Sequence, residues 1–331
     1  MSWTIDIFAF LFGAAWGSFL NVLIYRLPNK LSLIRPNSFC PKCSAPIKPY
    51  DNVPIVAWFY LRGKCRACSA PISWRYPAIE ALMALLSLLL AIKVFHPSLD
   101  ALVLGTEPWW PVLLAYFSLF FFVAALVALF FIDLDVTELP PEITVPGIAV
   151  GLLFAELLPE LGRMGSFVPN ISLFDAVLGA LIGGGLILLL IVGYFLATGR
   201  VGMGGGDIWM MAMVGAFLGW QSLLFIFLAS SVQGIAVALL GVALGAKQRS
   251  GEQGGLFRNQ DAQQMQEEVD TAVRGAAVEQ AQSPDEGLRK LAIPFGPFIA
   301  ISALEYVFLG EWVLPWLTAG VVGPNGFLSI R

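Results

Sequence analysis

Long apolar runs dominate this chain and limit the environment in which it can fold. Eight runs approach membrane-spanning length, at about residues 5–25, 77–95, 111–132, 143–161, 173–197, 207–220, 222–245 and 295–317. A helix needs roughly 20 apolar residues to cross the hydrocarbon core of a bilayer. The composition agrees, because only 13% of the 331 residues are charged, against roughly 25% in soluble domains. The sequence therefore predicts an all-α polytopic membrane protein with about eight transmembrane helices, in contact with the lipid bilayer.

Basic residues are concentrated in one segment, and their position predicts the orientation. Nine of the 19 Lys and Arg residues lie between Arg26 and Arg75, with Asp51 as the only acid among them. Positively charged loops stay on the cytoplasmic side, so this segment is predicted to be cytoplasmic and the N-terminus to lie outside. Counting through eight spans places three further segments on the cytoplasmic side, at 133–142, 198–206 and 246–294.

These boundaries divide the chain into five predicted regions. They are a first transmembrane helix at 1–26, a cytoplasmic cysteine-containing loop at 27–76, a membrane core at 77–245, a polar cytoplasmic insertion at 246–292, and a last helix with an external C-terminus at 293–331. The run at 207–220 is short, and Gln221 barely separates it from the next run, so the two form either one hairpin or a re-entrant element. The insertion is expected to be a surface helix with mobile flanks and no catalytic role.

Acidic residues are predicted at the cytoplasmic ends of two spans. "FIDLD" places Asp133 and Asp135 at the end of the third span, and Asp207 opens the sixth span. Two carboxylates at close range share a proton, so one can activate water while the other protonates the leaving group. Helix packing that brings Asp133 and Asp207 together would form such a pair. The pattern therefore favours acid-catalysed hydrolysis.

The alternative interpretation of Asp207 is structural, because Asp is a favoured N-cap residue. Asp135 is expected to be solvated. The only histidine, His96, follows the second run in a predicted external loop, so a Ser–His or Cys–His nucleophile is not expected. Glycine lets an extended peptide approach the backbone closely. Three predicted substrate-binding positions therefore precede the acid: Gly204, Gly205 and Gly206.

All four cysteines stand in the basic cytoplasmic segment, as two C-x-x-C pairs: Cys40, Cys43, Cys65 and Cys68. This spacing is typical of tetrahedral thiolate coordination of zinc. Two disulfides or free thiols are the alternatives, and a reducing cytoplasm disfavours the disulfides. The segment is therefore predicted to be a zinc-ribbon-like loop. With four protein ligands, the zinc would fold the loop and perform no chemistry.

Six short sequence motifs occur along the chain, and their combination in this order is more specific than any single motif. They are "GAAWGSFLNVLIYRLP" at 13–28, the paired C-x-x-C loop, "SWRYPAIEAL" at 73–82, "FIDLD" at 131–135, "MGGGD" at 203–207 and "IPFGPF" at 293–298. Together they resemble the type IV prepilin peptidase family. The resemblance implies a G-x-G-D aspartic protease of the bacterial inner membrane, with Asp133 and Asp207 as the catalytic pair and the four cysteines as zinc ligands. It implies type IV prepilins or type II secretion pseudopilins as substrates, cut between a basic leader and an apolar helix, and no nucleic-acid partner.

The same resemblance implies a second activity, methylation of the new N-terminal amine with S-adenosylmethionine. No glycine-rich nucleotide-binding fingerprint precedes the spans. The candidates for this activity are the zinc loop and five residues of the first run: Gly17, Ser18, Asn21, Tyr25 and Arg26. Two positions depart from the family pattern, because Pro141 stands where an I-P-D acid is usual and Trp209 where a lysine is common.

Two other classes of function stay open at this point. A cation-coupled transporter would use the acids as an ion site, although the key acids are predicted at one membrane face. A non-enzymatic pilus or secretion assembly factor would use "GGGD" only as a helix cap. The acids Glu80, Glu156 and Glu305 are expected to have structural partners in either case.

Overall fold

The computed structural model describes residues 2–35, 38–40, 42–106, 108–157, 171–199, 204–243 and 295–318. Within these ranges the chain is helical, with two isolated β-bridges and no strand. Five helices in them are long and apolar enough to cross a membrane by length and composition: Ser2–Arg26, Arg75–Val103, Trp109–Val136, Leu173–Thr198 and Trp220–Leu240. The all-α membrane architecture is confirmed, while the eight-span count stays a prediction. The insertion at 246–292 and the end of the chain at 319–331 lie outside the described residues.

The described chain forms two compact units. The first unit contains residues 1–96 and 127–140, and the second contains residues 97–126, 141–245 and 295–331, each with the gaps given above. Helix α5 (Trp109–Val136) contributes to both units. The predicted external loop that begins at His96 contains the short helices η2 (His96–Ser98) and α4 (Leu99–Val103).

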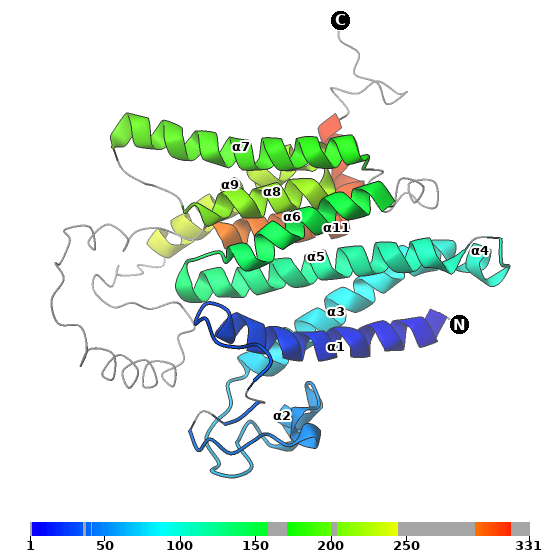
Figure 1. Cartoon of the computed structure of the whole chain (residues 1–331), viewed down its shortest axis with the longest axis vertical. Helices are drawn as coiled ribbons and strands as arrows, with labels where there is room; N and C mark the ends of the chain where they lie inside the picture. The colour runs from blue at the N-terminus through cyan, green and yellow to red at the C-terminus, as the bar shows by residue number, and fades with distance from the viewer. Residues whose placement is uncertain are drawn as a thin grey trace, which may run out of the picture. The chain divides into compact units, whose positions relative to one another are not determined.

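In the first unit, α1 (Ser2–Arg26) packs antiparallel to α3 (Arg75–Phe95) (Figure 1). Two glycines of α1 permit the close approach. A Cβ on Gly13 would lie 2.9 Å from the Cα of Ala84, and a Cβ on Gly17 would lie 2.6 Å from the Cα of Glu80. Small residues four apart allow helix backbones to come together in membranes, where lipid already solvates the larger side chains. The N-terminal motif is therefore, at these two positions, a helix-packing motif.

The second unit is built around a short helix, α8 (Gly206–Leu218), which contacts α6 (Pro141–Leu157), α7 (Leu173–Thr198), α9 (Trp220–Ala243) and α11 (Gly296–Thr318) (Figure 1). Thirteen residues span about 20 Å, which is less than the roughly 30 Å of the hydrocarbon core. The helix can be this short because protein surrounds it, and most of its side chains are buried. Gly219, with φ 75°, ends α8 and leads directly into α9, so the short run and its successor are two helices joined at one glycine.

Glycines also set the contacts of α8. A Cβ on Gly215 of α8 would collide with the carbonyl oxygen of Gly179 on α7, and the reverse collision occurs for Gly179. On α6, a Cβ on Gly147 would lie 2.9 Å from the Cγ of Met213, and one on Gly151 would lie 2.9 Å from the ring of Phe217. The ascending order of these pairs shows that α6 and α8 run parallel, with their N-terminal ends at the same level.

Candidate functional site

The two predicted catalytic acids are both buried. Asp133 is 5% exposed and Asp207 is 7% exposed, and they are the only buried aspartates among the described residues. Asp133 belongs to the first unit and Asp207 to the second. A carboxylate withdrawn from water costs free energy unless its surroundings compensate. Burial of two such groups, both at helix ends, is therefore a reason to expect a function for them.

Helix geometry gives each acid its place. Asp133 lies near the C-terminal end of α5, where the N–H of Thr137 donates to the Asp133 carbonyl oxygen (2.9 Å) and Thr137 itself, with φ 55°, ends the helix. Asp207 lies in the first turn of α8, whose N-cap is Gly205. The interpretation of Asp207 as an N-cap is therefore wrong. A carboxylate in the first turn is instead favoured by the positive end of the helix dipole.

Asp135, expected to be solvated, forms a two-pronged ion pair. The Arg75 guanidinium donates to both carboxylate oxygens of Asp135, at 2.8 and 2.7 Å. The same guanidinium lies over the ring of Phe131, 5.0 Å from its centroid. Arg75, at the start of α3, thus holds the residues two before and two after Asp133. The pair also places the start of α3 and the end of α5 at the same end of the first unit.

The glycines before Asp207 leave space beside the carboxylate. A Cβ on Gly204 would have only the Oδ2 atom of Asp207 nearby, at 3.8 Å, and a Cβ on Gly205 would meet nothing within 4 Å. Gly204 and Gly205 are exposed, whereas Gly206 is the first residue of α8. Space is therefore left beside the backbone at Gly204 and Gly205, and the role of the three glycines in substrate binding stays a prediction.

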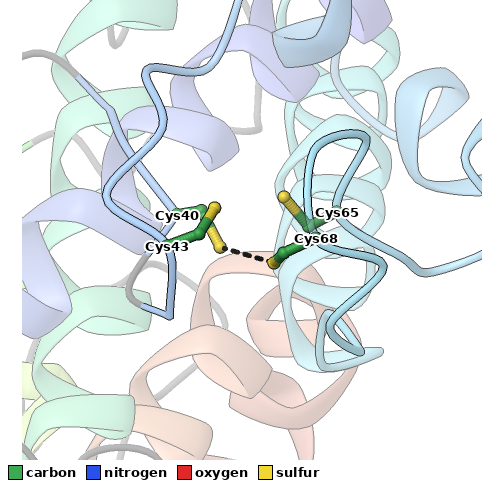
Figure 2. A group of neighbouring side chains, drawn as sticks. All are labelled: Cys40, Cys43, Cys65 and Cys68. Atoms are coloured by element: carbon green, nitrogen blue, oxygen red, sulfur yellow. Dashed lines mark hydrogen bonds between the residues drawn. The ribbon is translucent and has the colours of Figure 1, made fainter.

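The four cysteines come together in the loop between α1 and α3. Their sulfur atoms all lie within 4.8 Å of one another, and the Cys40 and Cys68 sulfurs are 3.8 Å apart (Figure 2). Four sulfurs at a zinc–sulfur distance of about 2.3 Å stand about 3.8 Å apart at the corners of a tetrahedron. All four residues are free cysteines. The cluster can therefore hold one metal ion, and the disulfide alternative is wrong.

Two copies of one local structure build this cluster, each around the pattern C-x-x-C-S-A-P-I. In the first copy, the N–H of Cys40 donates to Ala45 and the N–H of Ser44 donates back to Cys40. The second copy repeats both bonds with residues 65, 69 and 70 in place of 40, 44 and 45. Each copy closes through a serine of positive φ, 56° and 59° respectively. The repeated bonds present two pairs of thiols toward each other (Figure 2).

The electrostatics of the thiols also favour a cation. Hydrogen bonds, first among them one from the backbone N–H of Cys68, lower the pKa of the Cys65 thiol to about 7. For Cys43, the backbone N–H of Ala45 lowers the pKa, but the other three thiols and desolvation raise it to about 11. Four neighbouring thiols therefore do not all ionise at neutral pH by themselves. A bound divalent cation supplies the charge that allows all of them to become thiolates.

Few apolar side chains support this loop. Trp58, on α2 (Val56–Tyr60), donates from its indole to the carbonyl of Ile72 (3.0 Å) and covers Gly63. Arg66 pairs with both carboxylate oxygens of Asp51, at 2.8 and 2.5 Å, and its guanidinium holds the pKa of Asp51 below the usual range. These contacts tie the second cysteine pair to the rest of the loop.

Most of the residues predicted as candidates for S-adenosylmethionine binding form hydrogen bonds or packing contacts with other residues of the chain. The Asn21 amide donates to the carbonyl oxygens of Tyr76 and Gly17 (3.1 and 3.3 Å). Buried Arg26 donates to the carbonyl of Ser32 (2.9 Å), and Ser18 is hydrogen-bonded to Glu80. Gly17 is at the contact with α3, and Tyr25 is exposed. These five residues therefore do not form a cofactor site by themselves, and we assign no step of a methyl transfer to them.

Other ionisable groups have structural partners. The Glu80 carboxylate accepts the backbone N–H of Ile55 at 2.6 Å, which links α3 to the cysteine loop. Glu305 accepts the amide of Gln233 at 2.8 Å, so both acids are paired as expected, whereas Glu156 is exposed. His96 pairs with Asp6 at 3.0 Å, within the first unit and at the end of α3 opposite to Arg75.

Two family models match the chain. The model described as "Bacterial Peptidase A24 N-terminal domain" matches residues 11–94, which include the four cysteines, and the one described as "Type IV leader peptidase family" matches residues 120–239, which include Asp133 and Asp207. The prepilin leader peptidase/N-methyltransferase of Aeromonas hydrophila is 34% identical over 340 residues, covering 96% of this chain and 94% of that relative. The chain belongs to the type IV leader peptidase family.

Other relatives with the same name also cover more than two thirds of the chain. The one from Myxococcus xanthus is 32% identical and covers 95% of this chain and 93% of its own. The one from Neisseria gonorrhoeae is 36% identical and covers 69% of this chain and 79% of its own. No solved structure matches this family member.

Two features of the site were missed from the sequence. The repeat of S-A-P-I after each cysteine pair is visible in the printed sequence and could have been found there. The ion pair of Arg75 with Asp135 joins residues 60 positions apart, and no local pattern announces it.

Proposed function

We propose that this chain is a membrane aspartic endopeptidase that removes the basic leader from type IV prepilins or type II secretion pseudopilins at the cytoplasmic face of the bacterial inner membrane. The observation that carries the proposal is the burial of Asp133 and Asp207, alone among the described aspartates, within the segment that matches the leader peptidase family. The names of the relatives provide the substrate class.

The proposed chemistry uses the two carboxyl groups as a pair that shares one proton. The ionised carboxylate takes a proton from water, and the oxygen of that water attacks the carbonyl carbon of the scissile peptide bond. The protonated carboxyl group then gives its proton to the nitrogen as the carbon–nitrogen bond breaks. The products are a leader with a new carboxylate and a pilin with a new N-terminal amine, and Asp133 and Asp207 return to their starting state.

The proposed topology has eight spans, with the N-terminus outside and both acids at the cytoplasmic level. Two side-chain contacts support the arrangement of the first three spans, one hydrogen bond and one ion pair. Asp6 meets His96 at one end of the first unit, and Arg75 meets Asp135 at the other. The basic cysteine loop adjoins the end that carries Arg75 and Asp133, and the positive-inside rule favours a cytoplasmic location for that end.

We further propose that Cys40, Cys43, Cys65 and Cys68 hold one structural zinc ion. The spacing of the sulfur atoms fits a tetrahedron of the zinc–thiolate size. The role of this ion is to fold the loop, because four protein ligands leave no open position for a substrate or water. Lys42, Lys64 and Arg66, which adjoin the ligands, offset the negative charge of the four thiolates.

The glycines at 204–206 are proposed to border the bound peptide, with the scissile bond beside Asp207. On this account the bond is selected by its depth in the membrane, since the apolar helix of the substrate lies in the bilayer. Moving the scissile bond one helical turn, about 5.4 Å, deeper into the apolar segment should abolish cleavage even with its neighbouring residues kept. Efficient cutting at the displaced bond would show that sequence alone selects it.

Methylation of the new amine is proposed from the names of the relatives. S-adenosylmethionine would supply the methyl group, and the amine produced by the cleavage would accept it.

The experiment that tests the proposal is processing in a defined membrane. The purified chain is reconstituted into liposomes with a prepilin that carries a basic leader, and the masses of the products are measured by mass spectrometry. We expect one cut between leader and apolar helix, and one added methyl group when S-adenosylmethionine is present. An intact prepilin after prolonged incubation with folded protein would refute the peptidase, and a cut but unmethylated product would refute only the second activity.

A further inference from the structure

Thr144, on α6, carries a buried hydroxyl group that nothing in the described structure satisfies. The residue has no exposed surface (0%), and its Oγ1 atom has no hydrogen-bond partner. A threonine within a helix commonly bonds its hydroxyl to a carbonyl one turn earlier, and Thr144 does not. A buried polar group without a partner costs stability, so its presence needs an explanation.

The position of Thr144 on α6 shows what it faces. Thr144, Gly147 and Gly151 follow one another at the spacing of a single helix face. Gly147 and Gly151 are in contact with Met213 and Phe217 of α8. Thr144 therefore lies on the face of α6 that packs against α8.

The parallel course of α6 and α8 sets the level of Thr144. Moving back from the pair of Gly147 and Met213 by one turn on each helix brings Thr144 to the level of Met210. One further turn on α8 reaches Asp207, which is three residues before Met210 and is its neighbour on the helix surface. Cβ atoms tilt toward the N-terminus of their helix, so the side chain of Thr144 leans toward the turn that carries Asp207.

We propose that Thr144 is a positioning residue, whose hydroxyl donates a hydrogen bond to the Asp207 carboxylate when a peptide is bound. The inference rests on the proposed function, in which Asp207 is one of the two catalytic acids. A carboxylate can accept about four hydrogen bonds, and a donor on one oxygen fixes which oxygen remains for water. The donor also stabilises the ionised form. The free hydroxyl is thus held ready in the resting enzyme and gains its partner only during the reaction.

Substitutions at Thr144 separate this role from packing. Thr144→Val keeps the shape and removes the hydroxyl, whereas Thr144→Ser keeps the hydroxyl and removes a methyl group. If the hydroxyl acts on Asp207, Thr144→Val should lower kcat for prepilin cleavage by about tenfold or more, with little change in KM and no fall in melting temperature. Thr144→Ser should stay within about threefold of wild-type kcat. If the residue only packs, the order reverses, because Val fills the site and Ser leaves a gap.

The controls are chosen within the same unit. Ser302 on α11 is another fully buried hydroxyl without a partner, and Ser302→Ala should leave kcat unchanged. Asp207→Asn reports on the proposed function itself: normal cleavage by this variant would overturn the peptidase mechanism, whatever Thr144 does. If Thr144→Val does not fold, Thr144→Ala and Thr144→Ser replace it, and Ser must then be clearly the more active. Wild-type kcat for Thr144→Val, or equal loss in the Ser and Ala variants, would overturn the role of the hydroxyl.

Discussion

The cysteine loop and the helices around α8 hold their shape by different means. Between Leu27 and Trp74, only Cys40 and Ala57 among the described apolar residues are buried, while Tyr50, Phe59 and Tyr60 are exposed. In α8, by contrast, Met210, Met211 and Met213 are completely buried, and backbones touch at Gly179 and Gly215. The loop has too little core to fold by hydrophobic burial, whereas α8 is buried and closely packed against its neighbouring helices.

The difference shows how each region fits its surroundings. A small segment in water gains little from burial and commonly depends on a metal or on disulfides. A helix in a membrane satisfies its own backbone hydrogen bonds, and its association depends on close packing of small residues. Damage to the metal site should therefore stay local, and damage to a glycine contact should spread through the bundle.

The largest expected effect comes from filling the contact between α7 and α8. Gly215→Val would place a branched side chain on the carbonyl of Gly179, and neither backbone can move without losing its neighbours. We expect a destabilisation of at least about 3 kcal/mol and little folded protein, measured by detergent-resistant yield and thermal melting. Gly193→Ala is the matched control, because a Cβ there meets nothing within 4 Å. Wild-type melting of Gly215→Val would show that the bundle is not closely packed there.

The second effect is confined to the loop. Cys65→Ser should lower the zinc content by about one equivalent per protein, and chelation of the metal should do the same to the wild type. Both changes should expose the amides of residues 38–73 to hydrogen exchange. The amides of α1 and α3 should keep their protection, because those helices contact each other directly. Mass spectrometry of exchanged peptides measures both. Loss of protection throughout α1 and α3 would contradict the separation of the two regions.

A smaller effect is expected where the loop's end meets α5. Arg75→Gln removes both the ion pair with Asp135 and the contact with Phe131, so the end of α5 loses two restraints on either side of Asp133. We expect kcat for cleavage to fall by about tenfold. Asp135→Asn keeps the contact with Phe131 and should cost about threefold or less. The double variant with the charges exchanged, Arg75→Asp with Asp135→Arg, should recover part of the lost kcat. Equal kcat in all variants would show that Arg75 does not position the end of α5.

The smallest effect tests the loop backbone. Ser44 and Ser69 have positive φ values of 56° and 59°, which glycine adopts at lower cost. Ser44→Gly and Ser69→Gly should each stabilise the metal-bound loop by about 0.5 kcal/mol, which is about a twofold gain in zinc affinity. A competition titration with a chelator measures it. A weaker affinity would mean that the serine side chains make contacts that matter more than the backbone.

The sequence predicted the helical membrane class and the meeting of the cysteines because both follow from local patterns. Apolar runs indicate the length of a helix, and paired C-x-x-C spacing indicates the ligands of one metal ion. Neither pattern reports neighbours in space. The burial of α8, the role of Gly13 and Gly17 in packing, and the partner of Asp135 all depend on other segments of the chain. Thr144 could not be found from the sequence, because a threonine in an apolar helix has no unusual appearance until its missing partner is seen.

Cleavage by single aspartate variants shows whether Asp133 and Asp207 are the catalytic pair. Asp133→Asn and Asp207→Asn are reconstituted with prepilin beside wild type and Asp135→Asn, and zinc content and melting are measured on the same samples. We expect no cleavage by the first two variants, substantial cleavage by Asp135→Asn, and unchanged zinc content and melting in all. Near-normal cleavage by either Asp133→Asn or Asp207→Asn would contradict the aspartic mechanism.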